Sequence, residues 1–158
     1  MNTVGARLDI TEALLAMLTA ATGRPVGDHT SPDDTPRLDA PAAQLQEAFP
    51  YCIVYSVDGG SFDGPPLGAP AADTGFSYQI TSVGLRRDQA EWMADLVRRC
   101  ILAQNVNGNW QVNIKSPVGW SVADRLSGGA PSGIMIEGEP PYRVYSTAER
   151  YTIQVTPA

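Results

Sequence analysis

The segment FSYQITSVGLRRDQAEWMADLVRRCILAQ (residues 76–104) carries two hydrophobic periods in direct succession. Over residues 76–83 apolar and polar side chains alternate, which is the period of a strand with one buried face. Over residues 88–104 apolar side chains recur every three or four positions, which predicts an amphipathic helix. Its expected buried stripe consists of Ala90, Met93, Leu96, Val97, Cys100 and Ile101. A strand that leads at once into a helix favours an α+β domain.

Further elements flank this strand and helix on both sides. The sequence predicts a helix over residues 11–22, a short helix over 41–49 and a strand rich in β-branched and aromatic residues over 51–57. Later strands are expected at residues 110–115 and 132–137, and residues 142–145 and 151–156 are expected to form the last strand or strand pair. Adjacent strands with helices inserted between them predict a mostly antiparallel central sheet of about four to five strands, with two main helices packed on one face.

Three long segments interrupt these elements and are rich in turn-forming residues. They cover about residues 24–40, 58–75 and 116–133, and each is predicted to be a loop. The 158 residues fit a single domain, 1–158, because domains typically contain about 100–200 residues. With 43% hydrophobic residues, the chain is expected to bury an ordinary core without a metal or a disulfide.

Nothing in the sequence suggests a membrane segment. No apolar run approaches the roughly 18–20 residues that a membrane-spanning helix needs. The N-terminal segment, which contains Arg7, Asp9 and Glu12, lacks the uninterrupted apolar stretch of a signal peptide. We therefore expect no membrane partner, and a location in a cytoplasm or inside a particle assembled there.

The charge of the chain is acidic and unevenly distributed. The net charge of −6 argues against a nucleic-acid-binding protein, which neutralises phosphates with a basic face. Residues 1–84 contain three arginines against ten acidic residues, whereas residues 85–158 contain eight basic against seven acidic residues. A molecule with one acidic side and one neutral-to-basic side can pack head to tail with copies of itself.

Residues that could support catalysis or metal binding do not form a known pattern. The single histidine, His29, lies in a polar segment and precedes Ser121, whereas a hydrolase elbow requires the order serine, acid, histidine. The glycine-rich segment 128–133 lacks the lysine of a phosphate-binding loop. Cys52 and Cys100 lie inside apolar patterns and are expected to be buried thiols, with a disulfide as the alternative. The sequence therefore predicts no catalytic residue, no cofactor and no metal.

Arginines at the second main helix are candidates for a protein interface. Arg86, Arg87, Arg98 and Arg99 bracket the helix predicted over 88–104. They form either a solvated face with local salt bridges or a contact surface for an acidic neighbour, because arginine is enriched in interfaces.

Aromatic residues and one long loop add further candidates. Trp92, at the start of the same helix, is expected in the core. Trp120, inside the predicted 116–133 loop, is a better candidate than Trp92 for an interface anchor. Phe62 and Asp63 are interface candidates because they lie in the 58–75 loop, which can reach a neighbouring subunit.

Three segments together resemble a known family. They are PYCIVYSVDGG (50–60), YQITSVGLRRDQAEWMADLVRRCIL (78–102) and PPYRVYSTAERYTIQVTP (140–157). An early strand, a strand that runs through SVG into an arginine-bearing helix, and a last strand that ends in V-x-P are similar to the tail terminator, or tail completion, proteins of long-tailed bacteriophages. Actinobacteriophage versions look most similar, in agreement with ten arginines against one lysine.

The resemblance implies an α+β domain that assembles as a homohexameric ring on the head-proximal end of the tail tube. The ring ends polymerisation of the tail tube protein and presents a surface to the connector, or adaptor, protein on the head side. DNA passes through the lumen only as cargo, and the expected location is the tail neck of the virion. The resemblance implies no catalytic residue and no cofactor, so the chain is not expected to be an enzyme.

Two other functions stay open. A head-closure or connector-adaptor protein of the same virion neck has a similar size and ring form. A small-ligand-binding or enzymatic α+β domain would instead require a tight pocket with a perturbed titratable group. The single histidine and the lack of a paired nucleophile count against the ligand-binding alternative.

Overall fold

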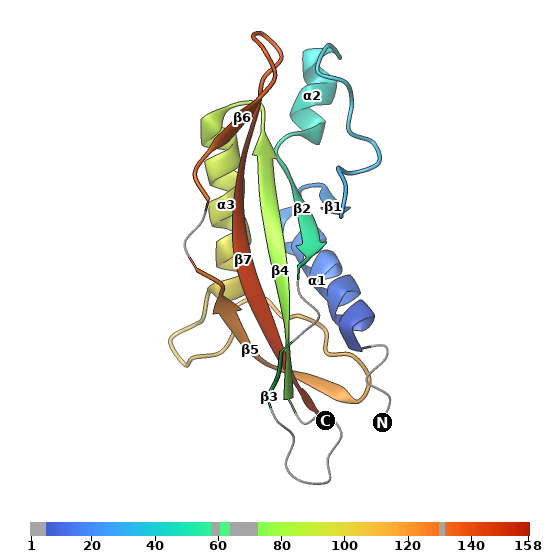
Figure 1. Cartoon of the computed structure of the whole chain (residues 1–158), viewed down its shortest axis with the longest axis vertical. Coiled ribbons are helices and arrows are strands. Elements are labelled where there is room, and N and C mark those ends of the chain that lie inside the picture. The colour runs from blue at the N-terminus through green and yellow to red at the C-terminus, as the bar shows by residue number, and fades with distance from the viewer. Residues whose placement is uncertain (1–5, 58–60, 64–72, 130–131) are drawn as a thin grey trace.

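The computed structural model describes residues 6–57, 61–63, 73–129 and 132–158. Its elements, in chain order, are α1 (Ala6–Thr22), β1 (Val26–Asp28), α2 (Ala42–Ala48), β2 (Tyr51–Ser56), β3 (Ser61–Asp63), β4 (Asp73–Gly84), α3 (Arg87–Leu102), β5 (Trp120–Ser127), β6 (Met135–Glu137) and β7 (Val144–Pro157). Figure 1 shows two long strands, β4 and β7, running side by side through the length of the molecule.

One sheet contains every described strand. Its main order is β1-β2-β4-β7-β5, with β3 paired to β4 and β6 paired to β7. Only β1 and β2 run parallel, and the other described pairs are antiparallel. The predicted α+β class and mostly antiparallel sheet are therefore confirmed. The described sheet has seven strands instead of four to five, because β1 and β3, with three residues each, are too short to show a period, and β5 lies in a segment predicted as a loop. The strand predicted at 132–137 is present as the shorter β6.

The helices α1 and α3 pack on one face of this sheet, as predicted, and enclose the main core (Figure 1). The helices contribute Ile10, Leu14, Met17, Leu18, Met93, Val97, Cys100 and Ile101 to this core, and the three central strands contribute Cys52, Val54, Phe76, Tyr78, Ile80, Tyr151, Ile153 and Val155. A smaller cluster lies around β2, where Tyr51 and Ile53 alternate with the core residues of that strand. Leu45 and Ala48 of α2 pack against this second cluster.

The predicted loop over 116–133 is wrong at its centre, because Trp120–Ser127 forms β5. This strand pairs with β7 from Trp120, opposite Pro157, to Ser127, opposite Tyr151. The register shifts between Val122 and Asp124. Such a bulge breaks the alternation of side chains between the two faces, so the sequence shows no strand period here.

The strand predicted at 110–115 is also wrong. Within the described part of the chain, this segment makes a single isolated bridge, between Gln104 and Trp110. Ile114 is buried and Val112 packs against the main core, so the alternation reflects an extended segment with one buried side.

Boundaries differ at three other predicted segments, and the last predicted strand or strand pair is a single strand. The segment 24–40 contains β1, and α1 begins at Ala6 instead of residue 11. The strands predicted at 142–145 and 151–156 form one continuous strand, β7. In the segment 58–75, β3 and the first residues of β4 form a short antiparallel ladder. The rest of that predicted loop, 58–60 and 64–72, lies outside the described residues.

Both cysteines are buried, free thiols, as predicted from their apolar surroundings. Burial raises the pKa of the Cys52 thiol from 9.0 to about 12, and the nearby Cys100 adds to this shift. The fold therefore favours the neutral thiol, so its contribution to stability is complete below about pH 9 and is lost as the pH rises toward 12.

This shift predicts a steep alkaline loss of stability. Between pH 9 and 10 the free energy of unfolding should fall by about 1 kcal/mol on account of Cys52 alone, since one pKa unit corresponds to about 1.4 kcal/mol. Urea unfolding at both pH values should show a smaller fall for Cys52→Ala, although this variant starts from lower stability because it leaves a cavity. Equal falls in the two proteins would contradict a buried, protonated Cys52.

Candidate functional site

The first two predicted interface arginines are engaged in local salt bridges. The Arg86 Nε atom lies 3.0 Å from Asp88 Oδ1, and the Arg87 Nε atom lies 3.1 Å from Glu91 Oε1. All four side chains are exposed. Water screens exposed pairs of this kind and they contribute little to stability, so they fit the interpretation of a solvated face.

Arg98 joins a different, largely buried network. Its Nε atom donates to Glu149 Oε2 at 3.1 Å, and its Nη2 atom donates to Glu149 Oε1. Tyr151 donates its hydroxyl to Glu149 Oε2 at 2.6 Å. The Glu149 side chain is only 8% exposed, whereas Arg98 is 45% exposed. The hydrogen bond to Glu149 raises the pKa of Arg98, and burial followed by the bond to Glu149 raises the pKa of Tyr151. This network fixes α3 to β7.

Arg99 differs from the other three arginines. It is exposed, and no carboxylate of the described residues forms a salt bridge with it. Trp92 precedes it by seven residues, so both side chains lie on the same face of α3. Trp92 is 53% exposed, which contradicts its predicted place in the core. The buried residues Ala90, Met93, Ala94, Val97, Cys100 and Ile101 define the opposite face of the helix.

Trp120 is buried instead of forming an exposed anchor. It is 5% exposed and belongs to the main core. The turn before β5 places it there, because Gly119 adopts a φ of 83° and the Trp120 N–H donates to the Pro117 carbonyl at 3.0 Å. A positive φ suits glycine, which has no Cβ. The interface role predicted for Trp120 is therefore wrong, since the ring has no free surface to offer.

The remaining predicted interface residues lie in β3. Phe62 pairs in register with Thr74, and Asp63 pairs with Asp73. This ladder lies at the first residues of the long strand β4, at the end of the molecule away from α3 in Figure 1. The structure therefore does not bring the predicted interface residues together into one site.

A hollow of about 510 Å³ lies between the turn over residues 32–36 and α2. Its lining combines proline rings with carboxylates: Pro25, Val26, Pro32, Asp33, Asp34, Thr35, Pro36, Gln44, Glu47 and Ala48. The three acidic residues are exposed, and none forms a salt bridge within the described part of the chain. We did not predict this hollow, because the sequence SPDDTP around it indicates only a turn.

Arg125 of β5 is buried at the end of α3. It is 4% exposed, and its guanidinium lies 4.8 Å from the centre of the Trp110 ring. Its Nη1 atom donates to the Ile101 carbonyl at 3.3 Å, where the helix dipole favours a positive charge. Its Nε atom has no hydrogen-bond partner among the described residues, and burial lowers the pKa of the side chain. Arg125 therefore joins the extended 103–119 segment to α3.

The part of the chain that the structure describes contains no group of three or more His, Cys, Asp and Glu residues that could hold a metal ion. His29 is exposed. Its Nε2 atom accepts the Ser56 N–H, and its Nδ1 atom lies 2.5 Å from Asp28 Oδ1. Ser121 lies within β5, not at an elbow between a strand and a helix. None of the described helices is long and apolar enough to span a membrane.

No protein-family model matches this sequence, and a search of curated proteins finds no match either.

Proposed function

We propose that this chain is a structural virion protein that caps the head-proximal end of a phage tail tube as a homohexameric ring. In this proposal the ring ends polymerisation of the tail tube protein and forms the joint to the connector on the head side. The chain acts by binding other proteins and catalyses no reaction.

The observation that supports this proposal most is that the three segments that resemble tail terminator proteins lie next to one another in the fold. They contain β2, most of β4 with α3, and β7. The strands β2, β4 and β7 are neighbours in the sheet, and α3 packs against β4 and β7. Segments far apart in the sequence thus form one contiguous unit at the centre of the fold, as expected if they specify a shared architecture.

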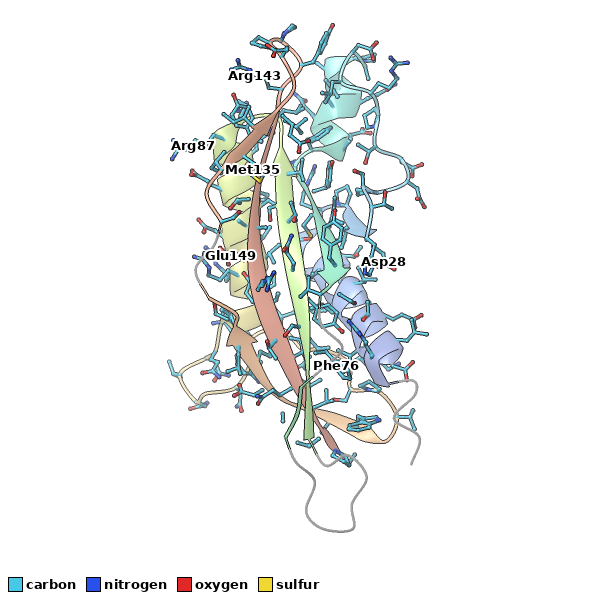
Figure 2. All side chains as sticks on the ribbon, in the orientation of Figure 1. Asp28, Phe76, Arg87, Met135, Arg143 and Glu149 are labelled. Atoms are coloured by element: carbon cyan, nitrogen blue, oxygen red, sulfur yellow. The ribbon has the colours of Figure 1, made fainter. Side chains whose placement is uncertain are left out.

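The distribution of charge also supports assembly from copies. Acidic residues of the first half lie around β1 and α2, at one edge of the sheet, whereas the arginines of α3 lie toward the other. In Figure 2 Asp28 and Arg87 lie on opposite sides of the molecule. The α3 flank is nearly neutral, because Arg86, Arg87 and Arg98 are paired with Asp88, Glu91 and Glu149, and Arg99 alone of these arginines has no salt bridge among the described residues. An acidic flank and a flank with one unpaired cation suit a heterologous contact, which is the kind of contact that closes a ring.

The proposal predicts that the purified protein stops tube growth. Mixed with its tail tube protein, it should give tubes with one capped end in negative-stain microscopy, and rings should be visible on those ends. Added during polymerisation, it should shorten the tubes as its concentration rises. A protein that ignores tubes but binds isolated head connectors would support the adaptor alternative. A protein that binds neither would refute a role in the virion neck.

A further inference from the structure

The outer face of α3 carries an apolar group that nothing in the described structure covers. Trp92 exposes 53% of its surface there, and the half-buried Leu96 lies one turn further along the helix. Arg99 lies about 10 Å from Trp92 along the helix axis and has no salt-bridge partner among the described residues. Tryptophan and arginine are the residues most enriched in binding hot spots.

The hollow between the 32–36 turn and α2 has the complementary chemistry. Pro25, Pro32 and Pro36 supply an apolar lining, against which an aromatic ring can pack. Asp33 and Asp34 are exposed at this hollow, and neither is neutralised by a cation of the described residues. A hollow in which proline rings lie beside carboxylates fits an aromatic side chain accompanied by a guanidinium.

The two surfaces cannot meet within one molecule. α1 contacts both α3 and β1 and so lies between them. In Figure 1 α3 lies on the left of the sheet, whereas α2, which forms one wall of the hollow, lies on the upper right. Both halves of a complementary contact are therefore present on one chain but only a second copy can join them.

We propose that the outer face of α3 of one copy docks into the 25–48 hollow of the next copy. The Trp92 ring packs against the proline lining, and the Arg99 guanidinium pairs with Asp33 or Asp34. This inference rests on the proposed function, and it specifies which two surfaces of neighbouring copies meet in the ring. Because the contact is heterologous, every open chain of copies keeps a free α3 face at one end and a free hollow at the other, so assembly continues until a ring closes.

Complementary variants test this contact directly. Trp92→Ala/Arg99→Ala removes the α3 half, and Asp33→Arg/Asp34→Arg removes the hollow half, while all four positions are exposed and should not affect folding. In sedimentation velocity each variant alone should associate at least tenfold more weakly than the wild type. An equimolar mixture should form a dimer and nothing larger, because only one intact contact remains. Arg87→Ala, on the same helix, is the matched control and should assemble like the wild type.

A second measurement separates this inference from the proposed function. Benzophenone placed at position 92 and irradiated on capped tubes should cross-link to residues 25–48 of a neighbouring copy. Capped tubes with cross-links elsewhere would overturn the docking contact and leave the proposed function standing. A dimer in the variant mixture together with no binding to tubes would support the contact and refute the proposed function. A wild type that stays monomeric to about 1 mM without the cross-link would overturn the contact.

Discussion

Replacing Trp120 with alanine is expected to lower the free energy of unfolding by about 3–5 kcal/mol, whereas Trp92→Ala should change it by less than about 1 kcal/mol. The two residues differ in burial, because Trp120 is 5% exposed and Trp92 is 53% exposed. Truncation of Trp120 leaves a cavity in the main core, next to the end of β7. Truncation of Trp92 removes a ring that lies largely in water.

Chemical denaturation followed by far-ultraviolet circular dichroism would measure both effects, since this signal does not depend on the tryptophan that is removed. Trp120→Phe serves as a control that keeps an aromatic ring, and it should recover part of the lost stability. If Trp92→Ala destabilised the monomer as much as Trp120→Ala, the assignment of Trp92 to an outer surface would be wrong.

Removal of Arg98 is expected to have the second largest effect, a loss of about 2–3 kcal/mol. Breaking a buried ion pair typically costs about 3–5 kcal/mol because it leaves the other charge unpaired. Here the cost is reduced because the Arg98 side chain is 45% exposed and is partly screened by water. The Glu149 carboxylate, at 8% exposure, would keep only the hydrogen bond from Tyr151.

A combined substitution distinguishes the cost of the unpaired charge from the value of the pair. Combined with Tyr151→Phe, which removes the buried hydroxyl that would lose its partner, Arg98→Met/Glu149→Leu should be within about 1 kcal/mol of the wild type, because an apolar cluster of similar volume avoids the burial of charge. Arg87→Ala, which breaks the exposed pair with Glu91, should cost no more than about 0.5 kcal/mol. An Arg98→Ala variant as stable as Arg87→Ala would show that Glu149 is not buried as described.

The fold class could be predicted from the sequence because its strongest segments obey a simple period. The buried face predicted for α3 is nearly the observed one, with Ala94 in place of Leu96. The same helical period also places Trp92 opposite that face. The prediction of Trp92 in the core was based on the apolar character of tryptophan and ignored the position of residue 92 around the helix. β5 was missed for a physical reason, since its bulge removes the alternation that marks a strand.

The candidate site was harder to predict than the fold. Salt bridges within a helix follow from spacing, so the pairing of Arg87 with Glu91 could be expected. The network of Arg98 with Glu149 depends instead on the register of β7 against β4, which places residues 51 positions apart in contact. The hollow at residues 25–48 likewise arises only when the 32–36 turn meets α2.

The central position of β7 has a consequence for how the chain reaches its native state. β7 pairs with β4, β5 and β6, and it follows all of them in the sequence. Until Tyr151, Ile153 and Val155 have left the ribosome, the apolar faces of α1 and α3 lack part of the sheet that covers them. Pairings between such distant segments form slowly, because the intervening chain must first be closed into a loop. Folding therefore finishes only after β7 has been synthesised, and the nascent chain exposes its core in the meantime.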